Sequence, residues 1–200
     1  MPTTSTPQGP NSGLDAHREF VLRVERLCRE DKRARAELRR GLGRPFDQCQ
    51  SMHRHLVKWN SNQASSTTRA ARYAVAALIA AAPADARTAA GAPVPPNLGA
   101  SLGQAVRRGA MKPSSAEATL HLLTRQQYTS VNRRLPALTR QIQRADTAID
   151  WGRLSDDLAR WDRARDRVAT RWLESYYRAV QAPDPTEPGT EPDPEPDSEQ

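Results

Sequence analysis

Arginine is the residue type in this chain that is best suited to binding chemistry, and it recurs in pairs and at helical spacing. Of the 30 basic residues, 27 are arginine. The planar guanidinium group binds phosphate through two parallel hydrogen bonds and stacks on nucleobases. Adjacent pairs occur at Arg39-Arg40, Arg107-Arg108 and Arg133-Arg134. We therefore expect one extended cationic surface, provided that helix packing brings these pairs together.

A further set of arginines follows helical spacing near the C-terminal end. If Asp150 to about Val180 form one helix, at about 100° per residue, the apolar residues fall within roughly 100° and the arginines within a separate stripe of roughly 80°. The apolar residues are Trp151, Leu154, Leu158, Trp161, Val168, Trp172 and Tyr176. The stripe comprises Arg153, Arg160, Arg163, Arg167, Arg171 and Arg178. The stripe is either a phosphate-binding surface or a solvated face with internal ion pairs, whereas we expect the tryptophans to lie in the core.

The charge distribution favours a polyanionic partner. The net charge of the 200-residue chain is +7. The segment from Asp184 to Gln200 carries seven of the 23 acidic residues and no basic residue, so the remainder has 30 basic and 16 acidic residues. A body with a net charge of +14 attracts nucleic acid through its phosphates.

Catalytic and metal-binding patterns find little support. His53 and His55 lie about 200° apart on a helix, so they cannot share a metal ion there. We expect the acidic pairs Asp156-Asp157 and Asp162/Asp166, which lie among arginines, to form ion pairs. Cys28 and Cys49 are not in a CxxC pair, and we favour two buried thiols over a disulfide. We predict a protein that is not an enzyme and has no metal ion and no cofactor.

The periodicity of apolar residues predicts an all-α protein with two helical lobes joined by a Pro/Ala-rich loop. We expect a disordered segment over 1–13, an N-terminal helical lobe over 14–82, a linker loop over 83–100, a C-terminal helical bundle over 101–181 and a disordered acidic tail over 182–200. Pro136 should kink or split a helix over 130–148, and Ser114 with Glu117 fits a capping box. No apolar run approaches the ~20 residues that a membrane span needs. We therefore expect a cytoplasmic protein that does not bind membranes.

Ordered short motifs carry a resemblance to a known family. They are Ser101-Leu102-Gly103 followed by Arg107-Arg108, then Asn132-Arg133-Arg134-Leu135, then Asp150-Trp151 with Trp161 and alternating arginines. Over Ser101 to Arg178 this order resembles the CasB family, the small subunit of the type I-E CRISPR surveillance complex called Cascade. A weaker match covers Ala36 to Pro45. No single motif is long, so the specificity comes from the ordered set and the chain length.

The resemblance implies an all-helical, non-catalytic protein that acts as two copies beside other Cascade subunits. It would brace the guide RNA and the target DNA, and help to hold the displaced strand of the R-loop. Because Pro136 directly follows Leu135, Arg140 is an alternative to the Arg133-Arg134 pair. The resemblance and the arginine stripe together give a set of candidates for nucleic-acid binding. They are Arg39, Arg40, Arg107, Arg108, Arg133, Arg134, Arg140, Arg160, Arg163, Arg165 and Arg167.

Two other classes of function compete with this interpretation. One is a free-standing helical nucleic-acid-binding regulator, although no compact helix-turn-helix unit is evident. The other is a protein-interaction adaptor whose arginines are engaged in ion pairs. Binding to RNA or DNA, and its dependence on salt, would separate the adaptor from the first two classes.

Overall fold

The computed structural model describes residues 12–60, 64–83 and 94–182, and all the regular elements in these ranges are helices. The α-helices are α1 (Ser12–Glu30), α2 (Lys32–Arg39), α3 (Gln50–Leu56), α4 (Ser66–Ala81), α5 (Leu98–Arg107), α6 (Pro113–Thr124), α7 (Tyr128–Arg144), α8 (Trp151–Ala159) and α9 (Trp161–Gln181). Two 3-10 turns, η1 (Phe46–Gln48) and η2 (Val57–Trp59), flank α3. The all-α prediction is confirmed. None of the described helices is both long and apolar enough to cross a membrane.

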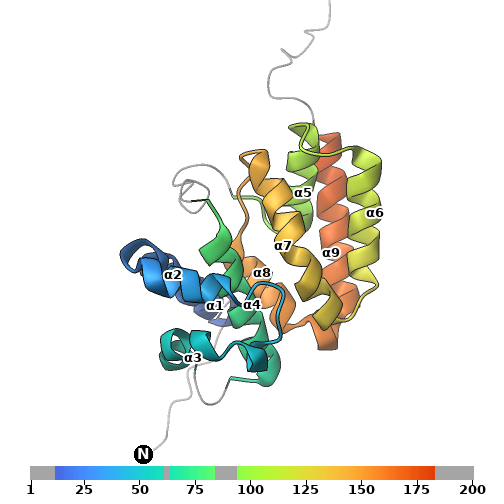
Figure 1. Cartoon of the computed structure of the whole chain (residues 1–200). Coiled ribbons are helices and arrows are strands. Elements are labelled where there is room, and N and C mark those ends of the chain that lie inside the picture. Colours follow the sequence, from blue (N-terminus) through green and yellow to red (C-terminus); the bar gives the residue numbers. More distant parts are fainter. Residues whose placement is uncertain (1–11, 61–63, 84–93, 183–200) are drawn as a thin grey trace, which may run out of the picture.

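The helices form two packed groups (Figure 1). In the first, α4 packs on α1, α2 and α8, and α8 also packs on α1. In the second, α9 packs on α5 and α6, while α7 contacts α5 and α6. Helix α8 thus joins the N-terminal helices, although its place in the sequence assigned it to the C-terminal bundle. The predicted acidic tail, apart from Ala182, and most of the predicted linker lie outside the described residues, as does most of segment 1–13.

The single helix predicted from Asp150 to about Val180 is wrong, because the chain breaks at Arg160. The backbone there has φ −98° and ψ −3°, and Ala164 departs further from helical geometry at φ −142° and ψ 30°. The two parts bury their apolar sides against different partners, α8 against α1 and α4 and α9 against α5. One straight helix cannot face both groups, so helical angles cannot be carried from Arg153 across the break.

Two tryptophans of the second group lie at the centre of the fold, as the sequence predicted. Trp161 and Trp172 are 1% and 0% exposed, and their ring centroids are 5.0 Å apart. Each indole N–H has a partner: Trp161 donates to the carbonyl of Gln126 at 2.9 Å and Trp172 to Asp157 Oδ2 at 2.7 Å. These bonds satisfy the buried polar atoms, so both rings are positioned by packing and by hydrogen bonding.

Three local predictions need correction. Pro136 does not split the helix, because α7 runs from Tyr128 to Arg144 and buries Val131, Leu135, Leu138 and Ile142 along its inner side. Helix α6 begins at Pro113, so Ser114 lies inside the helix and does not cap it. Proline suits a first helical position, because a backbone N–H there would have no partner within the helix. Helix α5 begins at Leu98, inside the predicted linker, because Asn97 accepts a hydrogen bond from Ala100 N at 3.1 Å.

Helices α5 and α9 approach each other so closely that glycine is required in the contact. A Cβ on Gly99 would overlap the backbone carbonyl of Trp172. A Cβ on Gly103 would lie 2.7 Å from both the Tyr176 carbonyl oxygen and Ala179 Cβ. The Ser-Leu-Gly motif of the sequence is therefore a helix-packing motif, with Gly103 one turn after Gly99.

Replacing Gly99 by alanine is expected to lower the free energy of unfolding by about 1–3 kcal/mol, the usual cost of forcing extra atoms into a packed contact. Gly13→Ala is the matched control, because it also lies in a first helical turn and its added Cβ would meet only Arg160 Nη2, at 3.6 Å. Urea denaturation of both variants measures the difference. Equal stabilities would show that the α5–α9 contact can relax without cost.

Candidate nucleic-acid interface

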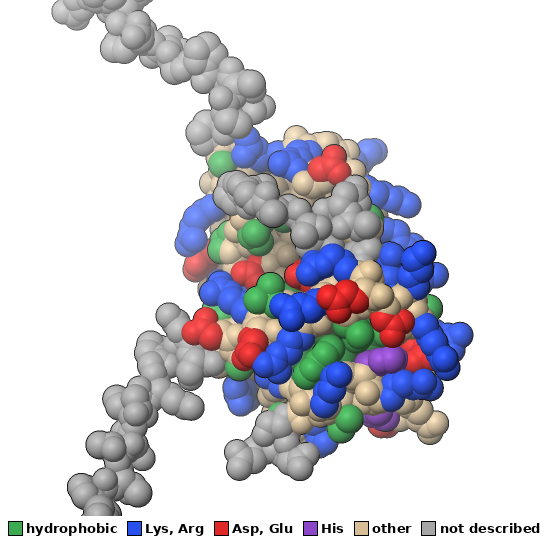
Figure 2. All heavy atoms as spheres, turned by 90° about the vertical axis from the view of Figure 1, so that its left-hand side faces the viewer, with side chains coloured by type: hydrophobic (Ala, Val, Ile, Leu, Met, Phe, Trp, Pro, Cys, Tyr) green, Lys and Arg blue, Asp and Glu red, His purple; other side chains and the backbone are tan. Residues whose placement is uncertain are grey.

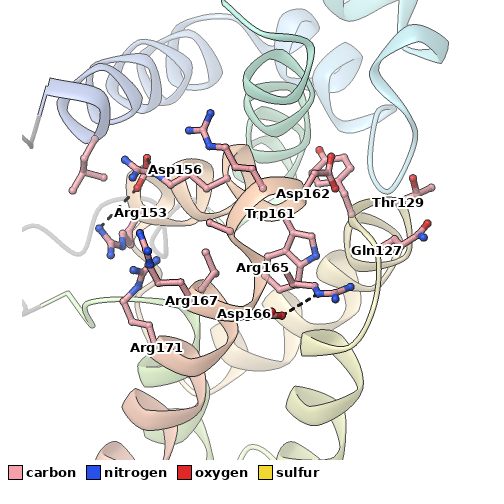
Figure 3. A pocket seen from close by; sticks show the side chains of 16 residues that line it. Gln127, Thr129, Arg153, Asp156, Trp161, Asp162, Arg165, Asp166, Arg167 and Arg171 are labelled. Atoms are coloured by element: carbon pink, nitrogen blue, oxygen red, sulfur yellow. Dashed lines mark hydrogen bonds and ion pairs between the residues drawn. The ribbon is translucent and has the colours of Figure 1, made fainter.

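A hollow of about 1180 Å³ lies at the junction of α8 and α9 (Figure 3). We call it the arginine hollow, because it is lined by Arg153, Arg160, Arg163, Arg165, Arg167 and Arg171. Three acidic residues, Asp156, Asp162 and Asp166, also line it. The predicted stripe is thus brought together by the break at Arg160, with the exception of Arg178, which does not line the hollow.

Two buried carboxylates hold three of these arginines in place. Asp157 is 0% exposed and accepts from Arg171 Nη2 at 2.5 Å, while Arg153 Nε lies 3.3 Å away. Asp156 accepts from Arg160 Nε at 2.8 Å. Burial raises the pKa of Asp157, against the opposing effects of the Trp172 indole and the two guanidinium groups. The predicted ion pairing of Asp156 and Asp157 is confirmed, and these contacts position the hollow.

The remaining arginines of the hollow are free to meet a ligand. Arg163 and Arg167 are exposed and form no ion pair within the described parts of the chain. Arg165 lies 3.6 Å from Asp166, but both side chains are exposed and such a pair contributes little. Six arginines face four carboxylates, counting Asp157 beneath the surface, which leaves a positive excess. The arrangement suits phosphate groups approaching from solvent.

Helix α7 carries a second cationic surface. Its sequence has four arginines and no acidic residue. Arg133, Arg140 and Arg144 fall within about 40° of one another at helical spacing, on the side opposite the buried residues of α7. A hollow of about 470 Å³ brings Arg39 of α2 beside Arg140 and Arg144. We call Arg133, Arg140 and Arg144, together with Arg39 of α2, the α7 arginine face.

Arg144 was missed by the sequence reading, although its spacing of four residues from Arg140 signals the same helix face. The other candidates lie elsewhere. Arg134 is exposed about 100° away from the α7 arginine face. Arg40 is exposed at the end of α2, and Arg107 at the end of α5.

Arg108 has a structural contact that the sequence did not indicate. Its Nη1 donates to the carbonyl oxygens of Ala145 at 3.0 Å and Asp146 at 2.6 Å, where α7 ends. Basic side chains commonly satisfy the last carbonyls of a helix in this way. The predicted residues therefore divide between the arginine hollow, the α7 arginine face, a separate side of α7 that carries Arg134, and the ends of α2 and α5. The two hollows share no lining residue.

The outer face of the first helices differs from both surfaces. Figure 2 shows that face, where Lys and Arg side chains alternate with Asp and Glu. Helix α1 alone carries four arginines and four acidic residues. Two of these arginines form ion pairs within the helix, Arg18 with Asp15 and Arg23 with Glu19. Helix α1 is therefore balanced in charge, unlike α7, which carries arginines and no acidic residue.

The histidines and cysteines are engaged in packing. Burial lowers the pKa of His17 to about 4, and its Nδ1 lies 2.6 Å from Ser155 Oγ. His55 Nε2 lies 2.7 Å from Glu37 Oε2, and this hydrogen bond lowers the pKa of Glu37. Cys28 and Cys49 are buried and form no disulfide with each other. Within residues 12–60, 64–83 and 94–182, no three His, Cys, Asp or Glu side chains are placed to hold a metal ion.

Comparisons with known proteins show which family and which solved structures this chain resembles. The family model described as CRISPR-associated protein Cse2 matches residues 34–177. A solved chain described as "CRISPR RNA-guided surveillance complex" is 38% identical with a TM-score of 0.72, covering 84% of this chain and 95% of that chain. A second, described as the pre-nicking complex, is 38% identical with a TM-score of 0.73, covering 84% and 94%.

A more distant match is to a CRISPR-associated protein of the Cse2 family from Thermus thermophilus. It is 25% identical with a TM-score of 0.62, over 80% of this chain and 97% of that chain. The CasB protein of M. ruber is also 25% identical, with a TM-score of 0.66, over 82% and 94%. A search of curated protein sequences gave no match.

Proposed function

The chain belongs to the CRISPR-associated Cse2 family, and from that membership we propose that it is a non-catalytic subunit of a cytoplasmic Cascade-type CRISPR surveillance complex. Its partners are the other subunits of the complex, a second copy of itself, the guide RNA and the target DNA. Its role is to hold nucleic-acid backbones and so to stabilise the R-loop. Family membership argues against the free-standing regulator.

The observation that carries the proposed role is the exposure of arginines without ion-pair partners on the two cationic surfaces. Arg163 and Arg167 in the arginine hollow, and Arg133 on the α7 arginine face, are exposed and form no ion pair within the described residues. Exchanging a DNA duplex for a guide–target hybrid is nearly balanced in free energy, so contacts to phosphates can tip it. Such contacts need no base specificity, because the guide reads the sequence by base pairing.

The isolated protein is expected to bind single-stranded nucleic acid in a way that depends steeply on salt and weakly on sequence. Each phosphate contact on a single strand contributes about 0.7 to the slope of log affinity against log salt concentration. Fluorescence anisotropy with two strands of unrelated sequence, over a series of salt concentrations, measures this slope. Binding that salt does not change, or no binding at all, would favour the protein-interaction adaptor.

A further inference from the structure

A smaller cavity of about 360 Å³ adjoins the arginine hollow and differs from it in chemistry. The linings of the two spaces share Tyr128, Thr129 and Asp162, so the spaces lie side by side. The smaller cavity has no arginine or lysine in its lining. Its walls come from the η1 turn, the first turns of α4 and α7, and the start of α9, which belong to both helix groups. A strand bound in the arginine hollow would therefore pass close to this second space.

The cavity has an aromatic wall that is held rigidly. Phe46 packs edge-on against Tyr73, with ring centroids 5.8 Å apart, and the guanidinium of Arg69 lies 5.8 Å from its centroid. Ala70, a small residue on α4, leaves space beside the ring. Tyr128 supplies a second aromatic side chain from the start of α7. Flat apolar walls of this kind suit a planar ring.

The polar groups of the cavity select the type of ring. Asp47 and Asp162 place carboxylates in the lining, which repel phosphate and accept hydrogen bonds. The hydroxyl oxygen of Tyr128 is buried and has no hydrogen-bond partner in the described parts of the chain. Burial and the nearby Asp162 raise the pKa of Tyr128. Because its hydroxyl oxygen is buried, Asp47 and Asp162 are the polar groups that a ligand in the cavity would meet. A neutral ring that carries an amino group matches this set.

We propose that this cavity, the base pocket, receives one unstacked nucleobase with an exocyclic amino group from a single strand whose phosphates lie in the arginine hollow. The inference rests on the proposed nucleic-acid function. The division of charge supports it, since cations line the space for the backbone and carboxylates line the space for the base. The volume lies near the lower end of the ~300–1,000 Å³ range of small-ligand pockets, which suits one ring and not a stack.

The test uses the full chain and 12-nucleotide strands that carry phosphates and sugars but no bases, except for one central base. A central cytosine is expected to tighten binding roughly 5- to 100-fold over the fully abasic strand, the effect of seating one base on aromatic side chains. Thymine, which lacks an exocyclic amino group, should gain less. The same strands with ribose establish whether DNA or RNA is the preferred source of the base.

Two variants separate the base pocket from the phosphate surface. Ala70→Phe should fill the cavity and abolish the cytosine advantage, while abasic strands bind as they do to the unmodified protein. Asp47→Asn should reduce the preference for cytosine over thymine. Asp166→Asn is its matched control, because it removes the same charge from a residue that lines the arginine hollow but not the base pocket.

The outcomes distinguish the two proposals. If cytosine and abasic strands bind the unmodified protein equally, or if Ala70→Phe retains the cytosine advantage, the base pocket is refuted while the phosphate surface stands. If no strand binds at any salt concentration, the proposed nucleic-acid function fails and the base pocket fails with it. A cytosine advantage that Asp166→Asn preserves and Asp47→Asn reduces establishes the site.

Discussion

Replacing Arg133, Arg134, Arg163 and Arg167 together by alanine is expected to weaken target-DNA binding by the assembled complex and to make its log–log salt dependence shallower by about 3 units. All four side chains are exposed, and none forms an ion pair within the described residues. Their loss should therefore leave the fold intact. The rules of guide–target pairing should not change, because the bases are read by the guide.

The measurement is target affinity of the reconstituted complex over a series of salt concentrations, with assembly checked by size-exclusion chromatography. A control variant also removes four positive charges, at exposed residues that line neither hollow: Arg26, Arg29, Lys32 and Lys58. The control should retain the salt slope of the unmodified complex. If the first variant assembles normally and binds target as tightly as the unmodified protein, these four arginines do not contact nucleic acid.

Replacing Trp161 by alanine is expected to lower the free energy of unfolding by about 3–5 kcal/mol, the usual range for deleting a large buried aromatic side chain. The ring is 1% exposed and packs on Trp172, and its loss would also leave the Gln126 carbonyl without its indole donor. Chemical denaturation followed by circular dichroism measures the change. Removal of most of a core side chain should shift the denaturation midpoint strongly.

Trp59→Ala provides the comparison for the Trp161 variant. Trp59 is only half-buried, and the ammonium of Lys58 lies 5.0 Å from its ring centroid. Its replacement should cost clearly less stability than that of Trp161. A Trp161 variant with an unchanged denaturation midpoint would place this ring at the surface, where it could stack on bases instead.

Much of the local structure follows from residue type and spacing. The side chains of Phe20, Val21, Val24 and Cys28 share one helix face and are buried, as their spacing of three and four residues predicts. Ion pairing of Asp156 with Arg160 is equally local, because the two are four residues apart on adjoining turns. The sequence likewise carried enough ordered motifs to indicate the family.

The sequence by itself determined that this protein is helical, cationic and built around tryptophans, because helix formation, charge and apolar periodicity are local properties. Only the tertiary structure decided that the chain breaks at Arg160, since the break arises from packing α8 and α9 against different helix groups. The break lets Arg171 reach Asp157, 14 residues earlier, and gathers the arginines around one hollow. Tertiary packing also places Arg39 and Arg140 around the same hollow, an arrangement that no spacing along one helix can encode.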